Sequence, residues 1–344
     1  MDVPCAYLHA SRDGLPKVYI RLGKDLVEIF LKLQPEYKSS VQNDGSLIVE
    51  SVKGLYGLIE SSFTWYNHFS NFLGELGFRP CDGDGCLFTN KGTTIALYLD
   101  DLIITGDHDS VNDTCQRIQE RFGDCKVKIG HCFNYLGMKF DIQNGKVGVK
   151  IELDKVLLNI NKSADTPAPG HLLMSSKNDQ LLNDSHREKF HSMVAKLLYI
   201  AKRTRPDILL TVNFLCTRVQ NPNMGDYLKL IRALRYLYGT SDASLVLTMN
   251  EAIDEKINMY VYIDASYGVH DDMKSHSGMI ITLGEGAILS MSTKQKCISK
   301  SSTEAELNAV TDLLPEAFHL RKIIEAVTGK KVRIVLYQDN MAAI

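Results

Sequence analysis

Alternating apolar and polar positions predict a β-hairpin near residue 100. Residues 95–99 alternate with a period of two, and a second apolar run over residues 102–104 ends at Thr105-Gly106. Asp100 and Asp101 then lie at or next to the turn. Carboxylates inside such a run are usually paired or bound to a cation, and two hard oxygen ligands suit Mg²⁺. The alternative is a pair of solvated turn residues, since Asp is common in turns.

Helical periodicity recurs in both halves of the chain. Trp65, Phe69 and Phe72 repeat at helical spacing, and Asp109 or Ser110 could cap the following helix. Predicted helices cover residues 51–78, 108–124, 186–204, 206–219, 226–238 and 303–314.

Short β-prone runs separate these helices. The dipeptide Asn144-Gly145 predicts a hairpin, and residues 163–184, which contain Thr166-Pro167-Ala168-Pro169-Gly170, form the best candidate linker. Predicted strands cover residues 18–22, 86–88, 93–99, 135–142, 146–149, 258–263, 278–283, 287–291 and 333–337.

Acidic residues also follow strands near the carboxyl end of the chain. Asp264 and Asp339 each come after a predicted strand, and Glu304 and Glu306 lie on the helix between those strands. Three carboxylates from separate elements converge on one metal only if the two strands are neighbours. The alternative for each acid alone is a capping or surface role.

Composition sets limits on the class of protein. The chain has 344 residues, of which 44% are hydrophobic and 23% charged, as expected for a globular protein of about two domains. No apolar run is long enough for a transmembrane helix, and the first residues do not form a secretory signal. None of the eight cysteines forms a Cys-x-x-Cys pair, which argues against zinc and indicates a reducing, intracellular compartment.

Charge is distributed unevenly. The net charge is −2, yet residues 187–235 carry ten basic and three acidic side chains, a local excess of seven positive charges. This segment could contact phosphates, or its cations could line ordinary solvated helix faces. The basic residues are Arg187, Lys189, Lys196, Lys202, Arg203, Arg205, Arg218, Lys229, Arg232 and Arg235.

Several sequence blocks together resemble the reverse transcriptase–RNase H region of Ty1/copia-type retrotransposon polyproteins. The order and spacing of the blocks extend over nearly the whole chain. The polymerase-like blocks are Asp2-Val3-Pro4-Cys5-Ala6-Tyr7-Leu8, Leu55-Tyr56-Gly57-Leu58 with Trp65-Tyr66, Tyr98-Leu99-Asp100-Asp101 and Tyr135-Leu136-Gly137. The later blocks are Thr204-Arg205-Pro206-Asp207-Ile208, Leu234 to Thr240, Ser301 to Glu306 and Asp339-Asn340.

The resemblance implies an α+β fold in three parts. A palm-type antiparallel sheet with helices and partial fingers would occupy residues 1–160. A basic, helical thumb and connection would occupy residues 161–250, and an RNase H-like α/β domain with a mixed sheet would occupy residues 251–344.

The resemblance also implies an RNA-directed DNA polymerase. Two Mg²⁺ ions, or Mn²⁺ in their place, would be held mainly by Asp2 and Asp100, with Asp101 in support. Tyr7 matches the position whose ring excludes a 2′-hydroxyl and so selects deoxynucleoside triphosphates. Other substrate-binding positions would be Gly57, Tyr98, Tyr135 and Gly137. The partners would be an RNA template and a DNA primer, with no membrane.

The RNase H resemblance implies a second pair of Mg²⁺ ions, held by Asp264, Glu306 and Asp339, which would cleave RNA paired with DNA. Glu306 is preferred over Glu304 because the family places its ligand directly before a large apolar residue, here Leu307. Glu304 is then a first-turn acid that the helix dipole favours. Such a protein would act in the cytoplasm, in a virus-like particle or in the nucleus.

Three departures from the family pattern favour a fragment with two incomplete domains. No long fingers segment precedes Asp2, and no further helix with a fourth acid follows Asp339. Ile59-Glu60 stand where the family often has Lys-Gln, and Glu60 would repel phosphate unless it is paired. The alternative function is therefore a catalytically incomplete remnant or a nucleic-acid-binding module. An unrelated small-molecule enzyme has little support, and the oligomeric state stays open.

Overall fold

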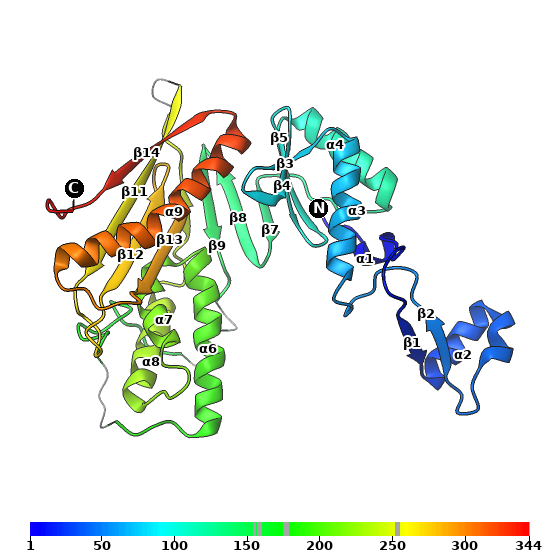
Figure 1. Ribbon diagram of the computed structural model, residues 1–344, viewed down its shortest axis with the longest axis horizontal. Coiled ribbons are helices and arrows are strands. Elements are labelled where there is room, and N and C mark those ends of the chain that lie inside the picture. Colours follow the sequence, from blue (N-terminus) through cyan, green and yellow to red (C-terminus); the bar gives the residue numbers. More distant parts are fainter. Residues whose placement is uncertain (154–155, 157–159, 175–178, 252–254, 344) are drawn as a thin grey trace. The chain divides into compact units, whose positions relative to one another are not determined.

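The computed structural model describes residues 1–153, 156, 160–174, 179–251 and 255–343, so residues 175–178 of the predicted linker lie outside the described part. The chain forms two compact units, residues 1–128 and 129–344, which are described separately. Figure 1 shows their elements.

The first unit contains the predicted hairpin within a four-stranded antiparallel sheet. Its strands follow the order β3-β4-β5-β6, and they are β3 (Arg79–Cys81), β4 (Asp84–Asn90), β5 (Thr93–Tyr98) and β6 (Asp101–Thr105). Leu97 pairs with Leu102 and Tyr98 with Asp101. The predicted strand–turn–strand arrangement around the two aspartates is confirmed.

Two helices complete the core of this unit. They are α3 (Ser61–Glu75) and α4 (His108–Phe122), which contribute Trp65 and Phe69, and Ile118 and Phe122, to one buried cluster with the sheet. The cap of α4 is Asp107, whose side chain accepts a hydrogen bond from the Ser110 amide at 3.0 Å. The predicted cap at Asp109 or Ser110 is therefore wrong by two or three residues, because the carboxylate must precede the free amide that it binds.

A small lobe precedes this core in the sequence. The short helix α1 (Ala6–His9) leads to a two-stranded sheet of β1 (Tyr19–Leu22) and β2 (Leu47–Glu50). Helix α2 (Lys24–Leu33) and the 3₁₀ helix η1 (Pro35–Ser40) lie between these strands in the chain.

The second unit begins with a four-stranded antiparallel sheet in the order β10-β9-β8-β7. Its strands are β7 (Cys132–Tyr135), β8 (Met138–Gln143), β9 (Lys146–Lys150) and β10 (Leu245–Leu247). The predicted single strand over 135–142 is wrong, because Leu136 and Gly137, with φ of 48° and 73°, make a turn. Asn144-Gly145 forms the predicted hairpin turn, with φ of 50° and 74°.

A helical bundle follows. Its members are α6 (Asp184–Arg203), the 3₁₀ helix η2 (Pro206–Ile208), α7 (Leu209–Cys216) and α8 (Met224–Gly239). They share a core that includes Phe190, Leu197, Leu215 and Leu234. The predicted helix over 206–219 starts as a 3₁₀ turn at Pro206 and ends earlier, at Cys216.

The last part of the chain is a mixed sheet with one long helix on a face (Figure 1). Strands β11 (Lys256–Ser266), β12 (His276–Thr282), β13 (Leu289–Lys294) and β14 (Lys331–Tyr337) lie in the order β13-β12-β11-β14. Only the β11–β14 pair is parallel. Helix α9 (Ser302–Thr328) packs Ala309 and Leu313 against the sheet.

Three predicted boundaries in this part need correction. Strand β11 continues past Asp264 to Ser266, because residues 264–266 stay paired with β12. Helix α9 runs through Pro315 to Thr328, well beyond the predicted end at residue 314. Strand β13 starts at Leu289, two residues later than predicted.

The predicted α+β class with palm-like and mixed sheets agrees with these elements. The functional boundaries at residues 160 and 250 stay a prediction. In the sequence, the division between the two compact units lies between Lys128 and Ile129. Within the described residues, no helix combines the length and apolarity needed to span a membrane.

Candidate metal centres

The hairpin turn in the first unit gives Asp100 a fixed position. Leu99 adopts a left-handed φ of 57°, and its carbonyl accepts a hydrogen bond from Trp65 Nε1 at 2.7 Å. Trp65 is fully buried, so this bond ties the turn to the hydrophobic core. A left-handed leucine is uncommon and needs such support from its surroundings.

Main-chain pairing brings Asp2 to this hairpin. Asp2 and Asp101 face each other in an antiparallel bridge. The flanking bonds run from the Val3 amide to the Asp100 carbonyl at 2.9 Å and from the Leu102 amide to the Met1 carbonyl at 2.7 Å. On its other side Asp2 exchanges two backbone bonds with Lys126, at 3.0 and 3.1 Å. The backbone therefore places two acids that are 99 positions apart beside each other.

Electrostatics at this site favours a cation. Burial raises the pKa of Asp101, and the negative charges of Asp100 and Asp2 raise it further. A divalent cation would offset this repulsion. The carboxylate oxygens of these three acids do not all lie within 4.8 Å of one another. Among the described residues, a second group of acids does converge this closely.

An aromatic pair lies beside these acids. The rings of Tyr7 and Tyr56 are 4.6 Å apart at an angle of 47°. Burial raises the pKa of Tyr56, and the charge of Asp100 is the next largest cause. The sequence interpretation selected Tyr7 and Gly57 but gave Tyr56 no role of its own, although the Tyr56-Gly57 motif was the signal for it. Gly57 has a φ of 99°, which a residue with a side chain would rarely adopt.

Glu60 has a basic partner. Its Oε2 lies 3.7 Å from Nη1 of Arg12, whose side chain is only 3% exposed. Arg12 also donates to the Pro16 carbonyl at 3.0 Å. The expected repulsion of phosphate by Glu60 is therefore reduced, because a neighbouring guanidinium offsets the carboxylate charge.

A second group of acids lies in the second unit. Asp264 on β11, Glu306 on α9 and Asp339 after β14 each offer a carboxylate oxygen, and these oxygens all lie within 4.8 Å of one another. They meet because β11 and β14 are adjacent parallel strands and α9 packs across them. The structure therefore fulfils the condition that the two strands be neighbours.

Glu306 is the buried member of this group. Its residue is 5% exposed, whereas Asp264 and Asp339 are exposed. Burial raises the pKa of Glu306, the charges of Asp264 and Asp339 raise it further, and hydrogen bonds from Gln338 and from the Ala265 backbone oppose the rise. Three carboxylates whose negative charges repel one another fit a hard divalent cation.

Glu304 has a different environment. Its carboxylate accepts a hydrogen bond from the Lys300 amide at 2.6 Å, and its own amide donates to Ser301 Oγ, the cap of α9, at 3.2 Å. Both hydrogen bonds lie at the start of α9, where they satisfy free backbone amides. Glu304 therefore stays apart from the group that Glu306 joins.

Two buried histidines near Asp264 were not selected from the sequence. His270 Nε2 and His276 Nδ1 are 3.0 Å apart, and His276 Nε2 is 2.7 Å from Ser292 Oγ. Burial, with the charges of His270 and Lys294, lowers the pKa of His276 to about 4. The pair is therefore neutral at pH 7. No spacing rule in the sequence would have predicted this contact, because His270 lies in a loop and His276 and Ser292 lie on two different strands.

The predicted primer-contacting residues belong to the second unit. Tyr135 ends β7, and Gly137 lies in the β7–β8 turn with φ of 73°. The hydroxyl of Tyr199 on α6 donates to the Leu136 carbonyl and holds this turn. The role of Tyr135 and Gly137 toward the acids of the first unit stays a prediction.

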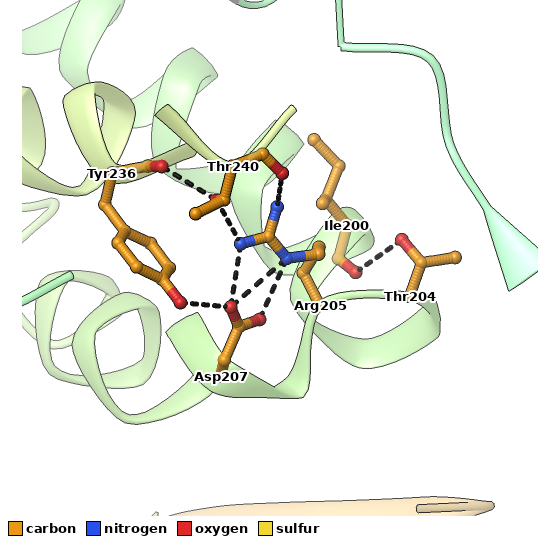
Figure 2. A network of polar contacts seen from close by, with 6 residues as sticks. All are labelled: Ile200, Thr204, Arg205, Asp207, Tyr236 and Thr240. Carbon is orange, nitrogen blue, oxygen red and sulfur yellow. Dashed lines mark hydrogen bonds and ion pairs between the residues drawn. The ribbon is translucent and has the colours of Figure 1, made fainter. Parts of the chain in front are cut away.

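Figure 2 shows that Arg205 and Asp207, from the Thr204-Arg205-Pro206-Asp207-Ile208 block, form a polar network with Tyr236 and Thr240. Arg205 is 4% exposed and donates to Asp207 at 2.7 Å and to the Thr240 carbonyl at 3.0 Å. The Tyr236 hydroxyl donates to the same carboxylate at 2.8 Å. The network joins η2 to α8, so these residues stabilise the bundle.

The basic segment is partly used inside the protein. Lys229 is buried and donates to the Met174 carbonyl, and Arg218 Nε donates to the buried Asp226 at 3.0 Å. Together with Arg205 they are not free to contact phosphates. Exposed cations of this segment include Lys189, Lys196 and Lys202.

The chain is similar in sequence to known reverse transcriptases and transposon polyproteins. Residues 1–167 match the family model described as "Reverse transcriptase (RNA-dependent DNA polymerase)". The whole chain aligns with the Pol polyprotein of transposon TNT 1-94 from Nicotiana tabacum at 28% identity, and with the transposon Ty1-GR2 Gag-Pol polyprotein from Saccharomyces cerevisiae at 26%. These matches support a copia-type retrotransposon reverse transcriptase region. The chain spans 26% and 20% of the length of these two relatives.

Solved structures support the reverse transcriptase-like fold. The foamy viral protease-reverse transcriptase in complex with RNA/DNA hybrid matches with a TM-score of 0.53 and 10% identity, covering 99% of this chain and 38% of that one. Its complex with dsDNA matches with a TM-score of 0.52 and 12% identity, covering 88% and 55%. At this sequence identity the likeness shows a shared fold.

Proposed function

We propose that the first unit carries out RNA-directed DNA synthesis, with Asp2, Asp100 and Asp101 as its metal ligands. One observation carries this proposal: main-chain pairing brings Asp2 beside Asp101 at a buried-core hairpin, within the segment that matches the reverse transcriptase family. The raised pKa of Asp101 fits a site that gains from a bound cation.

A pair of Mg²⁺ ions, or Mn²⁺, would supply activation of the primer hydroxyl and stabilisation of charge on the phosphates. The protein's own contribution is to orient the three carboxylates through the backbone pairs of Met1 to Val3. The ring of Tyr7, which packs on Tyr56, would limit the space for a 2′-hydroxyl of the incoming deoxynucleoside triphosphate.

An RNA template and a DNA primer would be the macromolecular partners. Support comes from the foamy viral protease-reverse transcriptase of similar fold, whose structures were solved with dsDNA and with an RNA/DNA hybrid. Gly57, Tyr98, Tyr135 and Gly137 would contact these substrates. Tyr98 is 56% exposed next to the aspartates, so its ring is accessible to a base or sugar.

A second function is favoured by the acids of the second unit. We propose that Asp264, Glu306 and Asp339 bind divalent cations and cleave the RNA strand of an RNA/DNA hybrid. The supporting observation is that their oxygens converge within 4.8 Å at the β11–β14 edge of a mixed sheet. In this proposal Asp264 and Asp339, which are exposed, would lie on the substrate side of the metal site. The buried Glu306 would supply its carboxylate from the protein side.

The first experiment is primer extension on an RNA template with a DNA primer and Mg²⁺. We expect Asp100→Asn to lower synthesis by more than about 100-fold, because a ligand is lost, while template–primer binding stays unchanged. Asp109→Asn, an exposed acid in the first turn of α4, is the matched control. Synthesis by Asp100→Asn at the rate of the parent would refute the ligand assignment.

RNA cleavage in a labelled hybrid tests the second function with the same proteins. We expect Glu306→Gln to abolish cleavage and spare synthesis, and Glu304→Gln to spare both. Cleavage retained by Glu306→Gln would move the ligand elsewhere. If the parent binds hybrid but neither extends nor cleaves, the chain is a nucleic-acid-binding remnant of the family.

A further inference from the structure

Gln338 makes two hydrogen bonds within the second group of acids. The residue follows the last residue of β14, Tyr337, and precedes Asp339. Its Nε2 donates to Glu306 Oε2 at 3.1 Å, and its Oε1 accepts from the Asn340 amide at 3.1 Å. One side chain thereby links the helix acid to the loop that carries Asp339.

The orientation of this amide follows from its partners. A backbone N–H can only donate, so the Asn340 amide must face the carbonyl oxygen of Gln338. The NH₂ group is then turned toward Glu306, whose ionised carboxylate can only accept. A flipped amide would lose both hydrogen bonds, and so the donor is held in place.

The hydrogen bond from Gln338 is shielded from water. Glu306 is 5% exposed, so water has little access to replace this bond. Gln338 precedes Asp339 in the chain, so its side chain couples the position of the Glu306 carboxylate to the segment that carries Asp339.

We propose that Gln338 is a positioning residue that sets the affinity of the Asp264–Glu306–Asp339 site for a divalent cation. The proposal rests on the metal-binding role suggested above for these acids. The amide engages Oε2 of Glu306 and thereby fixes the carboxylate plane relative to Asp264 and Asp339. Partners of this kind, which orient ligands from outside the coordination shell, typically change metal affinity by about 10- to 100-fold.

The test is calorimetric titration of the full chain with Mn²⁺. Asp2→Asn and Asp100→Asn are introduced in every protein, so that the acids of the first unit do not contribute to binding. On this background we expect Gln338→Met to weaken Mn²⁺ binding by about 10-fold or more, because it keeps side-chain length but removes both hydrogen bonds. Gln143→Met is the matched control, since Gln143 donates to Asp141 on the exposed end of β8.

A double exchange separates positioning from stability. Glu306→Gln combined with Gln338→Glu keeps the size of both side chains, keeps the acceptor for the Asn340 amide, and reverses the donor and acceptor roles between positions 306 and 338. We expect this protein to unfold at the same temperature as the background protein. Its Mn²⁺ affinity should nevertheless be lower than that of the background protein, because the carboxylate has moved from position 306 to position 338. Restored affinity would show that its position does not matter and would overturn the proposal.

The outcomes also separate this proposal from the nuclease function. Unchanged Mn²⁺ affinity in Gln338→Met overturns the positioning role, even if the parent cleaves hybrid. Weakened affinity supports the positioning role, even if the parent cleaves nothing, in which case the nuclease function fails. A background protein that binds no Mn²⁺ overturns both.

Discussion

Trp65 donates its indole N–H to the carbonyl of Leu99, one residue before Asp100. Its helical spacing with Phe69 and Phe72 places the three residues on one helix face, and all three side chains are buried. The bond from Trp65 to the turn could not be predicted, because hydrogen bonds between residues 34 positions apart leave no periodic signal. At the residue scale, then, composition and spacing identify buried side chains better than they identify the polar atoms these side chains carry.

Replacement of Trp65 by Phe tests this bond. The variant keeps an aromatic ring in the core but leaves the Leu99 carbonyl without its donor. We expect a loss of about 1–2 kcal/mol in the free energy of unfolding, measured by circular dichroism in urea. Phe63→Leu, at an exposed position of the same helix, should change it little. Equal stability of parent and Trp65→Phe would contradict the proposed support of the turn.

His276 gives a pH dependence of known sign. Its pKa is lowered from 6.5 to about 4, chiefly by burial, then by His270 and Lys294, while Asp272 is paired with Lys294 at 2.8 Å. A depressed pKa in the folded state means that the contribution to stability is complete above about pH 6.5 and is lost as the pH falls toward 4.

The measurement is the free energy of unfolding at pH 7 and pH 5 for the parent and for His276→Gln. We expect the parent to lose about 1–2 kcal/mol more than the variant over this interval, since glutamine does not titrate. His191→Gln, an exposed histidine on α6, should behave as the parent does. An equal loss in parent and His276→Gln would show that folding does not lower the pKa of this histidine.

Elements were predicted more reliably than their ends. The hairpins around Asp100 and Asn144 are confirmed, because a period of two and Asn-Gly chemistry are local signals. The break at Leu136-Gly137 and the continuation of α9 through Pro315 were missed. In both cases packing decides: Tyr199 holds the turn, and Leu313 and Ala317 remain in the core on either side of the proline.

The Arg205 network connects elements and can be tested as such. Burial would raise the pKa of Asp207, but hydrogen bonds from Arg205 and Tyr236, with the guanidinium charge, outweigh it and lower the pKa. Asp207→Asn leaves the buried Arg205 unpaired. We expect a loss of about 2–3 kcal/mol in the free energy of unfolding at pH 7, less than for a fully buried pair because Asp207 is partly exposed.

The pH dependence of this loss is specific. A lowered carboxyl pKa stabilises the protein above about pH 4 and ceases to do so as the pH falls through the folded value. The difference between parent and Asp207→Asn in urea unfolding should therefore shrink near pH 3. Asp184→Asn is the control, since its ion pair with Arg187 is exposed and should cost little. A difference that does not change with pH would rule out the charge as its cause.

For the molecule as a whole, the net charge did not indicate a nucleic-acid-binding surface. The local excess of basic residues indicated one only in part. Of the ten basic residues in the segment 187–235, Arg205, Arg218 and Lys229 make hydrogen bonds with neighbouring groups inside the bundle. The carboxylates illustrate the same limit. Their identity followed from the resemblance, but their convergence depends on strand neighbours that a single sequence does not reveal.

Salt dependence of hybrid binding tests which cations face nucleic acid. We expect Lys196→Gln, on the exposed side of α6, to reduce the slope of log affinity against log salt by about 0.7–0.9, the value for one lost phosphate contact. Lys322→Gln, an exposed lysine of α9 outside the basic segment, should leave the slope unchanged. The same slope for Lys196→Gln and parent would assign Lys196 to an ordinary solvated surface.

The bridge between Asp2 and Asp101 is made by backbone atoms, so the fold does not depend on the acids that the chemistry would need. On the function proposed above, a sequence with asparagine at either position would encode an inactive protein of normal shape. Such a protein would still bind the proposed template–primer duplex and compete for it with the active protein. Loss of the proposed activity would thus produce an inhibitor before it produces an unfolded chain.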